Sequence, residues 1–296
     1  MDAVLALDVG GTKVAAGVVD EDGHLLARAS RATPSGLDGE EVFGALLEAA
    51  LEVRTGVEVA CGVGSGGPMV RGETVSPLNI PAWRAFPLRR RLAEALGVSV
   101  FIDNDAKALA LGEGWCGAAR GADDYLAMVV STGVGGGIVL DGRLLDGGSG
   151  NAGHIGHVVV VPDGRACACG AYGCLEAEAS GTAIAARLGG PAASAPLEER
   201  RRAGRLVGQA VGSVAALLDL RLAVVAGSVA LGFGADFFDA AQGELERTAR
   251  ISFARGAEIR PAGLGDAGPL IGAAAVAWRA LGRSTLGRGA PPLGHQ

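Results

Sequence analysis

The chain has 296 residues, of which 49% are hydrophobic and only 4% aromatic, and it carries a formal net charge of −6. This length allows one large domain or two medium ones, each with a substantial core. The acidic balance, without a basic block, argues against a nucleic-acid surface. Because the sequence contains no 20-residue apolar span and no signal peptide, we expect no membrane partner and a cytoplasmic location.

Three short strands are expected at the N-terminus, at Val4–Leu7, Val14–Val19 and Leu25–Ala29. The turn between the first two, Asp8–Lys13, is rich in glycine, and Asp-Gly turn chemistry at 20–23 precedes the third. We therefore expect the three strands to form an antiparallel meander.

A similar passage occurs about one domain length later. A strand at Tyr125–Val130 is followed by the glycine-rich turn 131–137 and by a strand at Ile138–Leu140. Two copies of one hairpin-and-loop unit predict two domains of like topology that face each other across a cleft. A chance similarity is the alternative, since Asp-Gly turns are common in hairpins.

Helical periodicity alternates with short apolar runs along the rest of the chain. Two further strands are expected, at Val98–Ile102 and Leu222–Ala226. Helices are expected at Glu40–Arg54, Leu88–Leu96, Asp105–Trp115, Leu206–Leu218, Asp236–Ala249 and Leu270–Leu281. This alternation predicts the α/β fold class.

Two turns have the composition of phosphate-binding loops, Gly10-Gly11-Thr12 and Thr132–Gly137. Backbone N–H groups in a concave turn bind phosphate, and glycines leave the approach open. Asp8 stands where a strand opens into the first turn, and a carboxylate there can hold Mg²⁺. An ordinary tight hairpin is the alternative for either turn, but two turns in corresponding positions of a repeat favour phosphate binding.

A further glycine-rich run, Gly62–Gly67, matches the dinucleotide-binding pattern literally, whereas no Walker-type Gly-Lys-Ser/Thr sequence occurs. Pro68 follows the run at once, so no helix can begin there to face a pyrophosphate. We expect these glycines instead to let the backbone approach a small polar substrate.

The sequence Asp103-Asn104-Asp105 ends a strand and opens a helix, which is where α/β folds place ligands. Asp105 could accept the proton of an alcohol that attacks a γ-phosphoryl group, and Asn104 could hold neighbouring hydroxyls. Either side chain would also serve as a helix N-cap. Three polar residues in a row, two of them acidic, exceed what one cap requires.

Three of the five cysteines lie within eight residues, as Cys167, Cys169 and Cys174. Clustered thiolates are typical of a structural Zn²⁺ site, and His157 is close enough to complete four ligands. His154 competes with His157 on spacing alone, and three reduced cysteines without metal are the alternative. Glu176, two residues after the last cysteine, would be held rigidly by the site.

Five motifs, in chain order, resemble those of ROK-family sugar kinases: Asp8–Lys13, Asn104-Asp105-Ala106, Ser131–Gly137, Gly156-His157 and Cys167–Glu176. The resemblance extends from about Val4 to Leu281. It implies an actin-like fold, of the sugar-kinase and Hsp70 type, with two α/β domains flanking an ATP-binding cleft. A smaller domain is expected at 1–108 plus 279–296, and a larger one with the zinc-binding segment at 109–278. A homodimer or homotetramer is also implied.

The resemblance implies roles for individual residues. Asp105 resembles the catalytic base that deprotonates the sugar hydroxyl, typically at C6, with ATP and Mg²⁺ as cofactors. Sugar contacts are implied for Gly66, Gly67, Asn79, Asn104, His154, His157 and Glu176. Nucleotide contacts are implied for Asp8, Gly10, Gly11, Thr12, Lys13, Thr132, Gly133 and Gly227. His157 is thus expected to serve both as a sugar contact and as a zinc ligand.

Two positions depart from the family pattern. Lys107 stands where an asparagine is common, and we expect this replacement to change little. His154 stands where the family's glucokinases have a glutamate that contacts the sugar near C1 and C2. A neutral histidine offers one donor and one acceptor, and a donor could suit the carbonyl of an acetamido group at C2. Glucose and N-acetylmannosamine, or another amino sugar, therefore stay open as substrates.

The family that the motifs resemble also includes sugar-responsive repressors, the alternative from a different functional class. Those proteins carry a helix-turn-helix before the phosphate loop, whereas Asp8 comes almost at the start of this sequence. A catalytically silent sugar-binding protein is disfavoured because Asp8, Thr12 and Asp105 are all present. We therefore expect ATP-dependent phosphorylation of a hexose or amino-hexose hydroxyl.

Overall fold

The structure is a computed structural model that describes residues 2–36, 38–70, 73–283 and 285–286. The chain divides into two compact units. The first unit comprises 1–121, 142–152 and 263–296, and the second comprises 122–141 and 153–262. Among the described residues, each helix is too short or too polar to span a bilayer.

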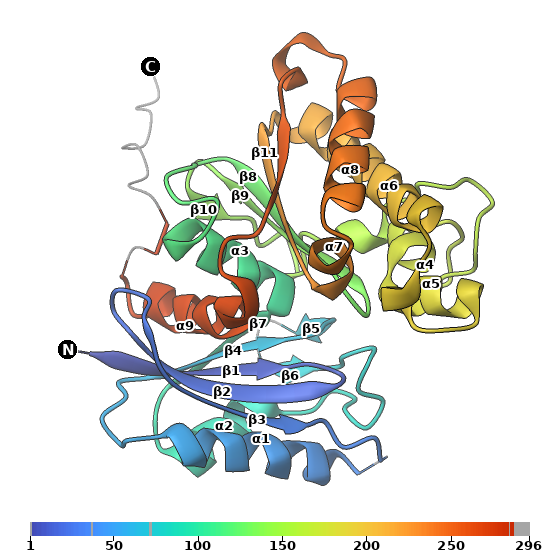
Figure 1. The fold of residues 1–296 in the computed structure, drawn as a ribbon. Coiled ribbons are helices and arrows are strands. Elements are labelled where there is room, and N and C mark those ends of the chain that lie inside the picture. The colour runs from blue at the N-terminus through green and yellow to red at the C-terminus, as the bar shows by residue number, and fades with distance from the viewer. Residues whose placement is uncertain (1, 37, 71–72, 284, 287–296) are drawn as a thin grey trace, which may run out of the picture. The chain divides into compact units, whose positions relative to one another are not determined.

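The first unit is built on a five-stranded sheet in the order β3-β2-β1-β4-β7 (Figure 1). Its strands are β1 (Ala3–Val9), β2 (Lys13–Asp20), β3 (Leu25–Ala32), β4 (Cys61–Ser65) and β7 (Val100–Asn104). The first three form the predicted antiparallel meander, whereas β4 runs parallel to β1 and β7 parallel to β4. A short hairpin of β5 (Met69–Val70) and β6 (Thr74–Val75) follows β4.

A second sheet repeats this arrangement in the order β10-β9-β8-β11-β12. Its strands are β8 (Tyr125–Val130), β9 (Val134–Leu140), β10 (Arg143–Leu144), β11 (Leu222–Ala226) and β12 (Glu258–Pro261). Strands β8 and β9 form an antiparallel hairpin, β11 runs parallel to β8, and β12 parallel to β11. The matching strand orders confirm the predicted α/β class and the predicted like topology of the two repeats.

Helices accompany both sheets. The first unit contains α1 (Gly39–Val53), α2 (Leu88–Leu96), α3 (Asp105–Cys116), η4 (Gly265–Ala267) and α9 (Gly268–Ala280). The second contains η1 (Ile155–His157), α4 (Leu175–Ala179), α5 (Gly181–Leu188), η2 (Ala192–Ser194), α6 (Leu197–Leu218), α7 (Ser228–Phe233), α8 (Ala235–Thr248) and η3 (Ser252–Ala254). Helices α6 and α8 pack side by side (Figure 1).

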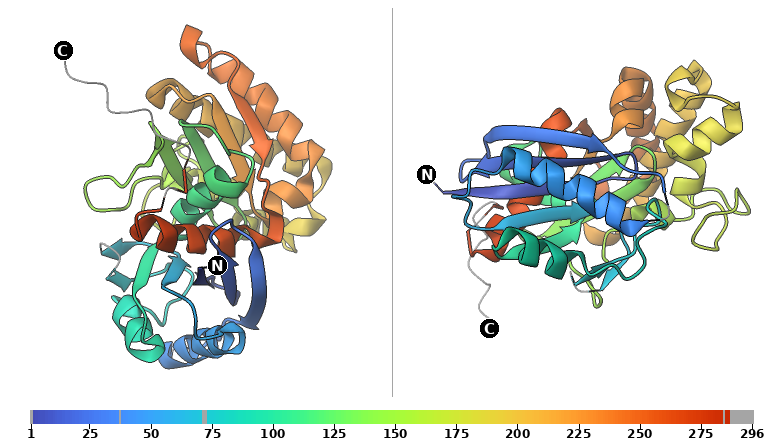
Figure 2. Two further views of the ribbon diagram at one scale, coloured as in Figure 1. Left: turned by 90° about the vertical axis from the view of Figure 1, so that its left-hand side faces the viewer. Right: turned by 90° about the horizontal axis from the view of Figure 1, so that it is seen from below.

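Strand β1 is buried on both faces, and its alternate residues belong to two cores. Leu5 and Leu7 pack with the apolar side chains of α1 and α2, whereas Val4 and Ala6 pack with those of α9. Figure 2 shows α1 and α2 together on one face of this sheet. Successive side chains of a strand point to opposite faces, so a strand covered on both sides reads as one continuous apolar run.

Predicted and observed elements agree best where the local signal is strong, and Leu88–Leu96, Tyr125–Val130 and Leu222–Ala226 have the predicted bounds. The expectation that Gly62 lies in a substrate loop is wrong, because this residue belongs to the buried strand β4. A Cβ at Gly62 would lie 1.9 Å from the carbonyl oxygen of Ala273 in α9. Glycine is therefore needed here for close packing of a helix on the sheet.

The bounds of the two units differ from the predicted domain boundaries. Helices α3 and α9 both pack against β4, so their contacts group them with the first sheet. The predicted boundaries at 108/109 and 278/279 fall inside these two helices. Residues 287–296, which the prediction adds to the smaller domain, lie outside the described residues.

Candidate active site

Parallel pairing brings three loops to one edge of the first sheet. Val9, Ser65 and Asn104 are in register in β1, β4 and β7. The carboxyl ends of these strands therefore lie at the same edge, and each is followed by one of the predicted site segments, Gly10–Lys13, Gly66-Gly67 and Asp105. This edge is the one at which α/β sheets bind ligands.

The turn after β1 is fixed by hydrogen bonds to its backbone. Gly10 donates its N–H to the carbonyl of Lys13 at 3.0 Å. Thr33 donates its Oγ1–H to the carbonyl of Gly10 at 2.7 Å and its N–H to the carbonyl of Thr12 at 3.1 Å. Thr12 and Lys13 themselves are exposed, so both are accessible to a ligand.

Asn79 lies between this turn and the glycines that follow β4. A Cβ at Gly11 would approach Asn79 Nδ2 to 2.8 Å, and a Cβ at Gly66 would approach Asn79 Oδ1 to 3.4 Å. The two glycines thus leave the space that the amide occupies. Gly67 comes next and precedes a cis peptide bond to Pro68. The Asn79 amide therefore lies between the first phosphate turn and Gly66, another predicted sugar contact.

Asp8 is partly buried, one residue before the end of β1. Burial, together with the negative charge of Asp105, raises the pKa of Asp8 from 3.8 to about 7, although Lys13 acts in the opposite direction. Two neighbouring carboxylates whose charge Lys13 balances only in part suit a divalent cation. Asp8 therefore fits the Mg²⁺ position expected from the sequence.

Asn104 and Asp105 lie where β7 ends and α3 begins. Asn104 Oδ1 accepts the N–H groups of Ala106 at 3.0 Å and Lys107 at 3.4 Å, which makes this side chain the N-cap of α3. Asp105 is the first residue of the helix, and its Oδ1 accepts the N–H of Ala106 at 2.8 Å. The capping alternative is therefore correct for the amide oxygen of Asn104, which leaves its amide nitrogen as a donor.

In the second unit, the start of α5 holds the turn between β8 and β9. Gly181 donates its N–H to the carbonyl of Ser131 at 2.7 Å, and Thr182 donates its Oγ1–H to the carbonyl of Thr132 at 2.9 Å. Sequence reasoning does not find this support for the turn. The available signal is Ser180, which caps α5 through the N–H of Ala183 at 3.1 Å.

Glu176 contacts the same turn. Its Oε2 accepts the N–H of Val134 at 2.9 Å, and a Cβ at Gly133 would lie 2.7 Å from that oxygen. A predicted sugar contact and a predicted phosphate-loop glycine are thus direct neighbours. A side chain at Gly133 would have to displace the Glu176 carboxylate.

Gly227 follows β11, beside the carboxyl end of β8. Its φ is +100°, and a Cβ there would lie 2.3 Å from the carbonyl oxygen of Val130, so glycine is required on both counts. The next residue, Ser228, has its Oγ 2.9 Å from Ser131 Oγ. The predicted nucleotide contacts of this unit therefore gather around one turn: Thr132, Gly133 and Gly227.

Four side chains form the cluster expected for a metal, and their ligand atoms all lie within 4.8 Å of one another: His157, Cys167, Cys169 and Cys174. Cys167 Sγ lies 3.7 Å from His157 Nδ1, and Cys169 Sγ lies 3.7 Å from Cys174 Sγ. Tetrahedral Zn²⁺ with sulfur at about 2.3 Å would separate its ligands by about 3.8 Å. The cysteines are free thiols rather than disulfides, so the donor set fits Zn²⁺.

His157 rather than His154 joins the sulfur atoms, which resolves the competition that spacing alone leaves open. The two imidazole rings lie 6.0 Å apart between centroids. Leu175 donates its N–H to the carbonyl of Val158 at 2.9 Å, and this bond holds the start of α4 against the end of η1. Glu176, the second residue of α4, is thereby held beside the cysteine cluster.

The predicted sugar contacts are divided between the units. Gly66, Gly67, Asn79 and Asn104 belong to the first unit, together with the predicted base Asp105, and His154, His157 and Glu176 belong to the second. Each unit also carries one of the two predicted phosphate turns, at 10–12 in the first and at 132–137 in the second. The second turn is shorter than predicted, because residues 134–137 belong to strand β9 and pair with β8.

Comparison with known proteins gives one consistent family. The sequence model of the ROK family matches residues 4–280. Over 185 residues the chain is 44% identical to the glucokinase of Thermotoga maritima, an alignment that covers 61% of this chain and 58% of that protein. Over 254 residues it is 36% identical to the N-acetylmannosamine kinase of Yersinia pseudotuberculosis, covering 78% of this chain and 84% of that protein.

A solved structure shows the same fold. The ROK family glucokinase from Streptomyces griseus, in complex with glucose and AMPPNP, superimposes with a TM-score of 0.79 at 32% identity, covering 92% of this chain and 98% of that chain. The repeated sheets therefore have the actin-like fold that the sequence motifs imply. The chain spans only about 58% of the length of the Thermotoga maritima relative in sequence alignment. Since the family match itself runs through residues 4–280, the chain belongs to the ROK family.

Proposed function

We propose that this ROK protein is an ATP-dependent sugar kinase that phosphorylates a hydroxyl, expected at C6, of a hexose or amino hexose. The observation that carries the proposal is the shared edge of the first sheet, where a phosphate turn, Asp8 and Asp105 come together. Phosphoryl transfer needs a phosphate site and a base held beside it. The similarity to a glucokinase and to an N-acetylmannosamine kinase supports the same activity.

In the proposed reaction, Asp105 takes the proton of the sugar hydroxyl as the hydroxyl oxygen attacks the γ-phosphorus of ATP. The bond from that phosphorus to the β,γ-bridging oxygen breaks, and ADP leaves. Backbone N–H groups of Gly11 and Thr12 in the first turn, and of Thr132 and Gly133 in the second, would bind phosphate oxygens. Asp8 would hold Mg²⁺, which offsets phosphate charge when bound. Asn104 would donate its amide N–H to a neighbouring hydroxyl.

The cysteine cluster has a structural role in this proposal. Four protein ligands complete a tetrahedral Zn²⁺ site and leave no position for a substrate. The metal would instead fix the segment that carries two proposed sugar contacts, His157 and Glu176. Family membership supports, as further parts of the proposal, a homodimer or homotetramer and a cytoplasmic location.

His154 bears on the identity of the sugar. An imidazole N–H would complement the carbonyl of an acetamido group at C2, whereas a carboxylate would accept from two hydroxyls of glucose. An ATP-coupled assay over glucose, mannose, N-acetylmannosamine, N-acetylglucosamine and glucosamine separates the two possibilities. Preference for an acetamido sugar supports the donor role of His154. Clear preference for glucose over the acetamido sugars defeats it.

Replacement of Asp105 by asparagine tests the proposed base. The substitution preserves size and removes the proton acceptor, so kcat should fall by about 10²–10⁴-fold while sugar binding is largely kept. Asp239→Asn, an exposed position in α8, is the matched control and should leave kcat unchanged. Turnover close to wild type in Asp105→Asn would sink the assignment. If the wild-type protein consumes no ATP with any sugar of the panel, a sugar-binding protein is favoured over a kinase.

A further inference from the structure

Lysine is rare in this chain. Of its 26 lysine and arginine residues, only Lys13 and Lys107 are lysines. Lys13 closes the first phosphate turn, and Lys107 lies in the first turn of α3, two residues after Asp105. Lysine presents a compact ammonium with three donors, whereas arginine presents a larger planar fork. A lysine that is buried therefore requires acceptors arranged around a single ammonium.

The surroundings of Lys107 meet that description. Its side chain is 3% exposed. Its Nζ donates to Asp103 Oδ1 at 2.9 Å, to Asp146 Oδ1 at 2.7 Å and to the carbonyl of Gly150 at 3.2 Å. Three acceptors match the three N–H groups of the ammonium, which is the condition for burying such a charge.

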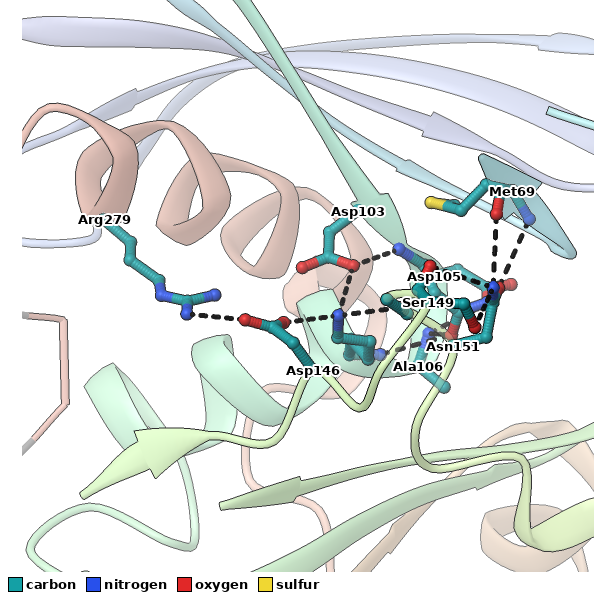
Figure 3. A network of polar contacts seen from close by, with 11 residues as sticks. Met69, Asp103, Asp105, Ala106, Asp146, Ser149, Asn151 and Arg279 are labelled. Atoms are coloured by element: carbon teal, nitrogen blue, oxygen red, sulfur yellow. Dashed lines mark hydrogen bonds and ion pairs between the residues drawn. The ribbon is translucent and has the colours of Figure 1, made fainter. Parts of the chain in front are cut away.

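The two aspartates extend this contact into a network, which Figure 3 shows from Asp103 through Asp146 to Arg279. Asp103 Oδ1 also accepts the N–H of Asn104 at 2.8 Å, and Asp146 Oδ2 accepts from Arg279 at 3.4 Å. Burial raises the pKa of Asp103 against the charge of Lys107. Burial acts in the same sense on Asp146, but Lys107 and Arg279 outweigh it and lower the pKa of Asp146. Two acids and two bases alternate, so the network adds no net charge beside Asp105.

Residues 146–151, here called the strap, are held at both ends within the first unit. Lys107 binds the Asp146 side chain and the Gly150 carbonyl. At the far end, Asn151 Oδ1 accepts the N–H of Met69 at 3.3 Å, and Asn151 Nδ2 donates to the Met69 carbonyl at 3.2 Å (Figure 3). Ala152 donates its N–H to the carbonyl of Asp146 at 3.0 Å, which closes the loop.

The strap thus joins elements that the proposed function assigns to the sugar. One end is tied to the turn of α3 that carries Asp105, and the other to β5, whose first residue comes two positions after Gly67. Along the chain, the strap ends three residues before His154. Loss of the ammonium would leave Asp103 and Asp146 without the cation between them, although Arg279 would still contact Asp146, and the strap would lose its hold on α3.

We propose that Lys107 is a positioning residue for the sugar, which acts through Asp146 by fixing the strap to the first turn of α3. The proposal rests on the kinase function proposed above. It contradicts the expectation that lysine in place of the family's asparagine changes little. Lys107 does not touch the reacting atoms in this proposal, so its loss should act on sugar affinity rather than on the ATP site.

The test uses three variants of the full chain, Lys107→Met, Asp146→Asn and the double variant. Steady-state kinetics should show that KM for the sugar rises about tenfold or more in each, because small misplacements of binding groups are costly, while KM for ATP stays unchanged. The double variant should be no worse than Lys107→Met alone, since both changes break one contact. Arg31→Met, which removes an exposed ion pair with Glu52, is the control and should leave both constants unchanged.

Several outcomes overturn the proposal: a sugar KM within twofold of wild type in both single variants, an equal rise in KM for ATP, or additive effects in the double variant. Should Lys107→Met fail to fold, Asp146→Asn carries the same test, because that side chain is 52% exposed and its loss of charge leaves the Lys107–Asp103 contact in place. A wild-type protein that is inactive on every sugar sinks the kinase function instead. In that case, hydrogen exchange of the strap amides tests the contact between Lys107 and the strap. The proposal predicts faster exchange in both single variants, and unchanged exchange rates contradict it.

Discussion

Replacing Gly62 by alanine distinguishes a packing glycine from a substrate-loop glycine. Gly62 lies within β4, the strand between β1 and β7 in the first sheet. A Cβ there would lie 1.9 Å from the carbonyl oxygen of Ala273 and 3.1 Å from Ala277 Cβ, both in α9. The packing argument therefore predicts a loss of stability, whereas a substrate-loop glycine would predict a loss of sugar affinity in a stable protein.

The expected loss of stability in Gly62→Ala depends on how far helix α9 must move away from β4. An ordinary contact would require the carbonyl of Ala273 and the new Cβ to separate by about 1.5 Å more. Helix α9 is buried along most of its length and packs against β1, β4 and α3, so this movement disturbs several contacts at once. Overpacking a core costs about 1–3 kcal/mol, and a clash with a main-chain carbonyl belongs at the upper end of that range. For a domain of this size, about 3 kcal/mol lowers Tm by about 6–12 °C.

Urea unfolding of the wild type and of Gly62→Ala measures this loss, and the sugar KM is measured on the same preparations. Gly44→Ala is the matched control, because a Cβ at Gly44 in α1 would have nothing within 4 Å. Alanine there should stabilise the protein by about 0.5–1 kcal/mol, the opposite sign. A free energy of unfolding for Gly62→Ala that equals the wild-type value, combined with a raised sugar KM, would refute the packing argument.

Two further outcomes are expected. The protein should contain one Zn²⁺ per chain, and Cys169→Ser should lower both the metal content and Tm. Cys116→Ser is the control, because Cys116 lies outside the cluster, and it should leave both values unchanged. Full metal content in Cys169→Ser would contradict the proposed metal site. Burial alone would raise the pKa of Glu58, but hydrogen bonds from Thr55 and Gly56 lower it below 4.5. This lowered pKa stabilises the folded state above about pH 4.5, and the stabilisation is lost as the pH falls through the folded-state pKa. Glu58→Gln should therefore cost about 1–2 kcal/mol in urea unfolding at pH 7 and less in acid, and a cost independent of pH would argue against this account.

Much of the fold is predictable because several elements carry their signals within themselves. In α2, Leu88, Leu92 and Leu96 are spaced four residues apart and are buried together, and Gly97 ends the helix in the left-handed conformation. The two copies of the hairpin and its glycine-rich turn likewise depend on neighbouring residues alone. Such local patterns are enough to predict an α/β protein with an internal repeat.

The elements that escape prediction depend on distant parts of the chain. Strand β4 has glycine at 62 and 64, which disfavours a strand on local grounds. Its conformation is stabilised by β1 and β7 on either side and by α9 above it. Strand β12 is short, mostly exposed and ends at Pro261, so it lacks the apolar run of a buried strand.

In the candidate site, too, the residue types can be predicted from the sequence, whereas most of their contacts depend on the fold. The three cysteines of the candidate metal cluster are predictable because they lie within eight residues of one another. The contact between Glu176 and the N–H of Val134 spans 42 residues, and the contact between Asn79 and Gly11 arises only when β1 and β4 pair. Spacing cannot choose between His154 and His157, because the choice depends on how η1 turns toward the cysteine segment.

The repeat also explains how one backbone arrangement supports two kinds of chemistry. Asp8 pairs with Ala15 one step before the turn that ends β1, and Val129 pairs with Gly135 at the equivalent step in β8. The first copy thus has a carboxylate where the second has an apolar side chain. Carboxylates repel phosphate unless a cation is present, and burial, together with the charge of Asp105, raises the pKa of Asp8 to about 7. The second copy instead has the hydroxyls of Ser131 and Ser228 beside its turn, and the carboxylate near it, that of Glu176, already accepts the N–H of Val134. A protein that bound the same ligand in each repeat would not need this asymmetry, whereas the proposed kinase needs a base and a carboxylate that can hold a cation in addition to anion-binding groups.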